Sequence, residues 1–147
     1  MDHEVAFGNV HVFVASFPTS GDAQTYTQEL WESEPDSSVS DEEYADWEDR
    51  NPTWKMRDEL GITFLDSDFI EIVWGSAGSQ DRADWTYLAS QIDSEGADAC
   101  KAMAPIGSNT LILILEGATG RFPFQFRSTS TLFHCGKFAW KAASHRQ

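Results

Sequence analysis

The segment "TLILILE" (110–116) restricts the fold of this chain more than any other stretch. Successive side chains of a β-strand point to opposite faces of the sheet, and here the residues on both faces are apolar. A short apolar run of this kind is typical of a strand that is buried on two sides. We therefore expect a central strand in a sheet whose two faces are both covered.

Other segments predict the remaining strands and the helices that would cover them. Apolar, β-branched or alternating runs indicate strands at about 10–17, 69–74, 121–128 and 131–140. Helical spacing and capping residues indicate helices at 20–33, 40–47, 53–61, 81–92 and 95–103. In the fourth helix Trp85, Leu88, Ala89 and Ile92 would share one face. The order of elements predicts an α+β fold, a single domain over 1–147 with a mostly antiparallel sheet of about five strands and helices packed on it.

The charge of the chain is large and unevenly distributed. The net charge is −14, and residues 1–99 hold 23 of the 24 carboxylates against four Lys or Arg. Residues 100–147 hold one carboxylate and six Lys or Arg. The negative field of the acidic part acts over a long range and repels the phosphates of nucleic acid. This charge distribution therefore disfavours direct binding of nucleic acid and favours a cationic partner.

The stretch "GITFLDSDFIEIVWG" (61–75) contains three carboxylates, Asp66, Asp68 and Glu71. A metal site would need their oxygens to converge at about 2.0–2.6 Å. In an extended strand, Asp66 and Asp68 would share a face with Ile70, whereas Glu71 would lie on the other face. The sequence therefore favours a polar loop entering a core strand, with a small metal-dependent hydrolase as the alternative.

The segment 32–49 is acidic throughout and contains no Lys or Arg. Like charges at this density repel one another and disfavour the compact state, and aromatic residues among them are typical of interface anchors. We therefore predict a partner-binding surface, with an exposed solvated segment as the alternative. Its residues are Glu32, Glu34, Asp36, Asp41, Glu42, Glu43, Tyr44, Asp46, Trp47, Glu48 and Asp49.

No residue pattern points to catalysis or to a cofactor. The chain has no G-x-S-x-G, P-loop or G-x-G-x-x-G motif. His134 and Cys135 are neighbours on a predicted strand, so their side chains would face opposite ways rather than act as base and nucleophile. His11 is expected to pack in the core. We expect no catalytic residues, no metal and no cofactor.

Cysteine usage and hydropathy give an expectation about the compartment. Cys100 and Cys135 do not form a C-x-x-C motif and read as reduced thiols. The start "MDHEVAFG" lacks the features of a signal peptide, and the longest apolar run is too short to span a bilayer. We expect a cytoplasmic protein that does not bind a membrane.

The block "WKMRDELGITFLDSDFIE" (54–71) resembles the Immunity protein 22 family, bacterial antidotes of polymorphic toxin systems. It has that family's order of aromatic residue, short helix, Gly-Ile, aromatic residue and Asp-x-Asp-hydrophobic-x-Glu. The stretches "VHVFVASF", "AQTYTQELW" and "TLFHCGKFAW" are also similar. The chain departs from the family at "FVAS", where a Trp and a Gly are expected, and in the unusual acidity of 32–49.

This resemblance implies a protein that binds a toxin domain and blocks it without chemistry of its own. We therefore expect an immunity protein for a basic toxin, such as a cationic nuclease, rather than an enzyme. Asp66, Asp68 and Glu71 would then be structural residues or a secondary part of the interface. The second alternative, beside the hydrolase, is an acidic DNA-mimicking inhibitor of a DNA-binding protein.

Overall fold

The computed structural model describes residues 8–76, 79–120 and 124–141. Its sheet contains β1 (Asn9–Ala15), β2 (Ile70–Trp74), β3 (Thr110–Leu115) and β4 (Phe133–Ala139). The strands are antiparallel and lie in the order β2-β3-β1-β4. Leu113 pairs with Val12 of β1 on one side and with Glu71 of β2 on the other. The prediction of an interior strand at 110–116 is confirmed.

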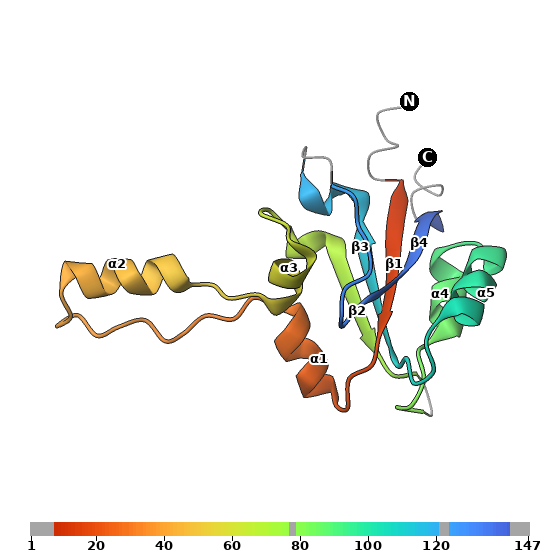
Figure 1. Ribbon diagram of the computed structural model, residues 1–147, viewed down its shortest axis with the longest axis horizontal. Helices are drawn as coiled ribbons and strands as arrows, with labels where there is room; N and C mark the ends of the chain where they lie inside the picture. The colour runs from red at the N-terminus through yellow and green to blue at the C-terminus, as the bar shows by residue number, and fades with distance from the viewer. Residues whose placement is uncertain (1–7, 77–78, 121–123, 142–147) are drawn as a thin grey trace.

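Helices cover both faces of this sheet (Figure 1). The described helices are α1 (Ser20–Thr27), α2 (Asp41–Arg50), α3 (Lys55–Leu60), α4 (Trp85–Gln91) and α5 (Ser94–Met103), with short 3-10 turns at Ser67–Phe69 and Glu116–Thr119. The α1–α3 pair lies on one face and the α4–α5 pair on the other, whereas α2 extends away from the body. The described residues thus confirm the α+β class.

Alternate residues of the strands point to opposite faces of the sheet, and each face has its own hydrophobic cluster. Phe13, Ile112 and Ile114 face α1 and α3, where they meet the fully buried Trp54 and Met56. The alternate residues Val12, Leu111 and Leu113 face α4 and α5, where they meet Leu88 and Ile92. Trp85 and Ala89 pack at the border of the second cluster, so the predicted apolar face of the fourth helix is confirmed.

The predicted strand at 121–128 is wrong over the part that the structure describes. Residues 121–123 lie outside the described residues, and 124–128 form no strand. Because β1 lies between β3 and β4, the chain must cross the face of β1 to reach β4. In this crossing segment the Phe126 ring lies 5.8 Å from that of Phe13 and 4.3 Å from that of His11. The alternating phenylalanines therefore reflect packing on the sheet, and the described sheet has four strands.

Two helices are shorter than predicted by more than one turn. The helix at 20–33 ends at Thr27, since the chain turns away to let Leu30 pair with Thr53. The helix at 81–92 begins only at Trp85, because the Asp84 carboxylate caps it by accepting the Tyr87 N–H at 3.0 Å. None of the described helices is both long and apolar enough to cross a lipid bilayer.

Glu59 of α3 fixes the crossing segment to the body. Its carboxylate accepts hydrogen bonds from the hydroxyls of Thr129 at 2.6 Å, Ser130 at 2.9 Å, Thr131 at 2.9 Å and Tyr26. Partial burial opposes ionisation, but these donors prevail and lower the pKa of Glu59 to about 2. One ionised carboxylate therefore joins α1, α3 and the crossing segment.

Candidate partner-binding surface

Residues 30–53 leave the body between α1 and α3 as a projection that we call the acidic arm (Figure 1). Leu30 and Thr53 close its base with two backbone hydrogen bonds of 2.7 and 2.9 Å. Next to the base, the indole N–H of Trp54 donates to the Thr27 carbonyl at 2.8 Å, and Trp54 is only 1% exposed. The arm therefore starts from a fixed point of the core, although no residue of α2 is itself buried.

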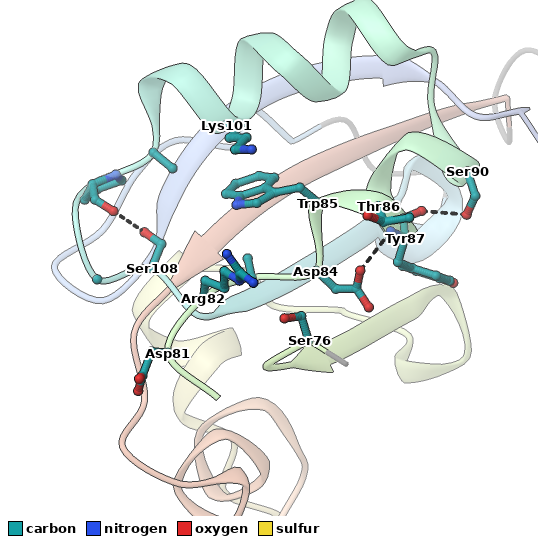
Figure 2. Close-up of a pocket in the computed structure, with 14 residues that line it drawn as sticks. Ser76, Asp81, Arg82, Asp84, Trp85, Thr86, Tyr87, Ser90, Lys101 and Ser108 are labelled. Atoms are coloured by element: carbon teal, nitrogen blue, oxygen red, sulfur yellow. Dashed lines mark hydrogen bonds between the residues drawn. The ribbon is translucent and has the colours of Figure 1, made fainter. Parts of the chain in front are cut away.

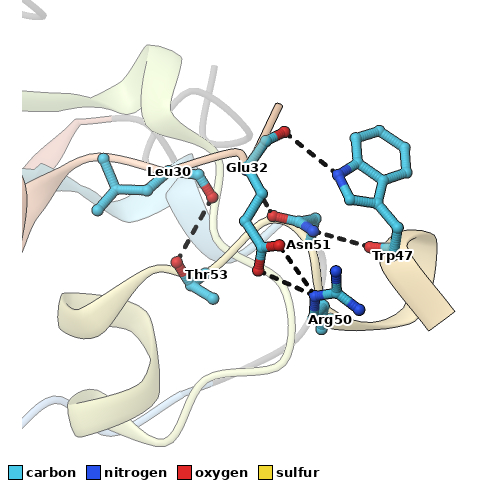
Figure 3. Close-up of polar contacts among 6 residues, drawn as sticks. All are labelled: Leu30, Glu32, Trp47, Arg50, Asn51 and Thr53. Carbon is cyan, nitrogen blue, oxygen red and sulfur yellow. Dashed lines mark hydrogen bonds and ion pairs between the residues drawn. The ribbon is translucent and has the colours of Figure 1, made fainter. Parts of the chain in front are cut away.

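Glu32 holds the outgoing chain against the end of α2 (Figure 3). Its two carboxylate oxygens accept from Nε of Arg50, each at 3.0 Å, and its N–H donates to Asn51 Oδ1 at 2.9 Å. Its carbonyl accepts the indole N–H of Trp47 at 3.2 Å. The hydrogen bond from Arg50 lowers the pKa of Glu32. These contacts engage Arg50, the basic residue within the arm, so it is not available to offset the remaining carboxylates.

Three aromatic rings pack against one another on the arm, outside the hydrophobic core. The ring of Trp47 lies 5.9 Å from Trp31 and 5.4 Å from Tyr44. The Tyr44 hydroxyl donates to Glu34 at 2.7 Å, which raises the pKa of the phenol. Trp31 remains 60% exposed. Partly exposed aromatic rings in mutual contact resemble the anchors of protein interfaces, which supply apolar area at low entropic cost.

Part of the acidic cluster has an explanation in the helix itself. Ser40 caps α2 by accepting the Glu43 N–H at 3.1 Å, as the capping pattern predicted. Asp41, Glu42 and Glu43 occupy the first turn, where the positive end of the helix dipole favours negative charge. That dipole does not favour the carboxylates further along the helix, at Asp46, Glu48 and Asp49. Their clustering is not explained by the stability of the helix.

The structure places all the sequence-predicted arm residues on this one projection. Glu32, Glu34 and Asp36 lie on the extended outgoing chain, and the other predicted carboxylates lie on α2. Between these two segments runs a groove of about 310 Å³. Its lining residues are Ser33, Pro35, Glu43, Asp46, Trp47 and Arg50. Two carboxylates beside an indole suit a cationic side chain, which an aromatic face also attracts.

Sequence reasoning missed two members of the arm. The predicted first helix (20–33) includes Trp31, but Trp31 belongs to the arm, where its tilted ring packs against that of Trp47. Arg50 directly follows the acidic stretch, and its ion pair with Glu32 spans eighteen positions of the sequence. The signal for Trp31 was an indole beyond the helical apolar face of Ala23 and Tyr26. The Arg50 pairing depends on the return of the chain and had no local signal.

The carboxylates of the second region do not converge. Asp66 accepts the backbone N–H of Asp68 at 3.0 Å and so caps the 3-10 turn before β2. Glu71 points to the other face of the sheet, where it accepts from the Tyr87 hydroxyl at 2.5 Å. Within residues 8–76, 79–120 and 124–141, no three His, Cys, Asp or Glu side chains are grouped so that they could hold a metal ion. This geometry gives the hydrolase alternative no support.

The neighbours His134 and Cys135 face opposite sides of β4, as predicted. His134 Nε2 lies 3.2 Å from Nδ1 of His11, while the Cys135 thiol contacts that of Cys100. Both cysteines are free and buried. His11 is 9% exposed, and burial followed by the charge of His134 lowers the pKa of His11 to about 4. His11 is thus a packed, hydrogen-bonded core residue.

No protein-family model, no curated protein and no solved structure matches this chain.

Proposed function

We propose that this protein is an immunity protein, of the kind the Immunity protein 22 family represents, and that it binds a basic toxin domain through the acidic arm. Binding would block the toxin by occlusion, without a reaction catalysed by this chain. A cationic nuclease is the toxin class that the charge of the arm fits best, since nucleases grip phosphate with Lys and Arg. The arm competes for the same cationic groups.

The observation that supports this proposal most is the projection of the arm from the body. Residues 31–52 contribute no side chain to either hydrophobic cluster, so folding of the body does not explain their acidic and aromatic composition. The arm is nevertheless ordered by the hydrogen bonds of Glu32 and Asn51 and by the ring contacts of Trp47. An ordered projection loses less conformational entropy on binding than a disordered segment.

The carboxylates of the arm are expected to change mainly the rate of association with the partner. Complementary fields increase association rates by about 10- to 1,000-fold, and the increase falls as salt screens the charges. The aromatic residues of the arm would act after the encounter, because Trp and Tyr anchors that become buried in an interface mainly slow dissociation. The proposal therefore assigns different kinetic steps to the carboxylates and to Trp47.

A DNA-mimicking inhibitor is the second candidate, and the elongated shape of the arm favours it (Figure 1). A mimic carries negative charges along an extended surface and displaces DNA from its target. The two candidates differ in the partner. A toxin inhibitor should bind the product of a neighbouring toxin gene, whereas a mimic should bind a DNA-binding protein and be displaced by duplex DNA.

The test is a kinetic comparison of two variants with equal changes of charge. Asp41→Asn, Glu42→Gln, Glu43→Gln and Asp46→Asn together remove four charges from the arm. Asp22→Asn, Asp58→Asn, Glu95→Gln and Asp98→Asn remove four exposed charges from the body. Association with the protein encoded immediately upstream is measured by stopped flow at two salt concentrations.

The arm variant should associate more slowly and show a weaker dependence on salt than the body variant. Equal association by the two variants would reject the arm as the binding surface and would point to the region of Asp66, Asp68 and Glu71. No binding by the unaltered protein would reject the toxin partner itself.

A further inference from the structure

A second concave surface lies beside α4 and α5 (Figure 2). These two helices cover the face of the sheet opposite α1 and α3, from which the arm leaves. It is a cleft of about 910 Å³ between residues 81–87 and residues 101–108, with Ser76 and Ser90 at its edge. This volume lies within the range of about 300–1,000 Å³ that is typical of sites for small molecules. No residue of the arm lines it.

Trp85 provides the cleft with a flat apolar surface. Figure 2 shows its indole between Lys101 on one side and Arg82 on the other. In the described part of the chain, the Arg82 guanidinium, the Lys101 ammonium group and the Trp85 indole N–H form no hydrogen bond or ion pair. Each of these three groups is a donor, and two of them are cationic.

Most other polar groups of the cleft are turned away or already engaged. Asp84 accepts the Tyr87 N–H and points toward that residue, and Asp81 points away from the indole (Figure 2). The Ser90 hydroxyl donates to the Tyr87 carbonyl at 2.6 Å, and the Ser108 hydroxyl donates to the Pro105 carbonyl at 2.7 Å. The hydrogen-bonding capacity beside the indole is therefore mainly donating and cationic.

We propose that this cleft binds a nucleoside phosphate, with the base stacked on Trp85 and the phosphate at the edge of the indole, between Arg82 and Lys101. Guanidinium and ammonium groups pair with phosphate oxygens, and aromatic side chains stack on bases of any sequence. A bare phosphate or a simple carboxylate would leave the indole and most of the cleft unused. This site is independent of toxin binding, because the arm lies elsewhere on the molecule.

Calorimetric titration with adenosine 5′-monophosphate tests the site directly. The unaltered protein should bind this nucleotide with a dissociation constant of about 1 mM or tighter. Adenosine and inorganic phosphate, which each carry half of the recognised chemistry, should bind at least about fivefold more weakly. Arg82→Gln and Lys101→Gln should each lower the affinity by about fivefold to tenfold.

A variant of the stacking residue and a matched control complete the test. Trp85→Leu should lower the affinity by about tenfold or more while it retains an apolar contact with the core. Lys55→Gln makes the same charge change on α3, on the other face of the sheet, and should leave the affinity unchanged. Arg82 and Lys101 are exposed, so their variants should stay folded even if Trp85→Leu does not.

Three outcomes would overturn the proposal. The first is no saturable heat with several millimolar nucleotide. The second is equal loss of affinity in Lys55→Gln and Lys101→Gln, which would mean a general effect of net charge. The third is equal affinity for adenosine, which would remove the role given to the two cations.

Discussion

Leu30 and Thr53 form an isolated antiparallel bridge, with each residue accepting the other's backbone N–H. This bridge separates the molecule into a body that holds the hydrophobic clusters and an arm that holds most of the clustered charge. Two residues paired in this way are placed to flank a short hairpin turn. The chain can therefore be closed across the base of the arm.

Replacing residues 31–52 with Asn-Gly should leave the body folded. The removed residues belong to neither cluster, and the shorter loop costs less entropy to close. The free energy of unfolding, measured with urea, should change by less than about 1 kcal/mol. Loss of cooperative unfolding would show that the arm supports the body.

Trp47→Ala should weaken binding to the partner mainly by faster dissociation. The Trp47 ring packs against Trp31 and Tyr44, and its indole N–H donates to the Glu32 carbonyl, so its loss removes the centre of the aromatic surface. Central interface anchors are worth about 2 kcal/mol or more. Surface-binding kinetics measure both rates, and a change confined to the association rate would contradict the assigned role.

Leu113→Asp should unfold the domain. Leu113 is 2% exposed at the centre of β3, and an unpaired carboxylate there has no partner to offset its lost hydration. Leu113→Ala, a milder change, should cost about 2–5 kcal/mol. Circular dichroism and urea titration distinguish the two results. A folded Leu113→Asp variant would contradict the interior position of β3.

The pair of His11 and His134 should make the protein less stable in acid. In the folded state, burial lowers the pKa of both imidazoles, and that of His11 is about 4, whereas a free imidazole titrates near 6.5. The unfolded chain therefore binds more protons between these values, so stability is present above about pH 6.5 and is lost as pH falls toward 4.

The measurement for this pair is urea unfolding at pH 7.5 and pH 5 for the unaltered protein and for His11→Gln. Carboxylates titrate in both proteins, so the difference between them isolates the imidazole. The unaltered protein should lose about 1 kcal/mol more than the variant between these two pH values. Parallel pH profiles would contradict the prediction.

Glu59→Gln should destabilise the body by about 1–3 kcal/mol. The amide has one accepting oxygen, so it cannot serve the four hydroxyls that now donate to the carboxylate. Because the pKa of Glu59 is depressed, this contribution is present above about pH 4.5 and is lost as pH falls toward 2. Glu29→Gln, an exposed change of the same charge, is the control for thermal unfolding.

The sequence correctly predicts those helices and strands that are determined by their own capping residues and apolar pattern. The caps at Ser40 and Gly61 marked the ends of short helices, and the apolar face around Leu88 marked a helix that packs on the sheet. The two-sided apolar run at 110–116 identified the interior strand, because only a covered strand tolerates such a sequence.

Long-range geometry accounts for what was predicted wrongly or missed. The alternation at Phe124 and Phe126 matches a strand, but only the order of the whole sheet reveals that this segment must cross β1. The end of α1 depends on the pairing of Leu30 with Thr53. The cleft beside Trp85 combines residues from two segments that have no common motif, so no single stretch of sequence predicts it.

The separation of arm from body has a consequence for how such a chain can change over generations. A substitution at Asp46 or Trp31 meets no packed neighbour from the hydrophobic clusters, so selection for a stable body does not constrain it. New recognition can therefore accumulate on the arm while the scaffold is inherited intact. The same property allows the arm to be exchanged: another segment whose two ends join Leu30 and Thr53 can replace it on this body.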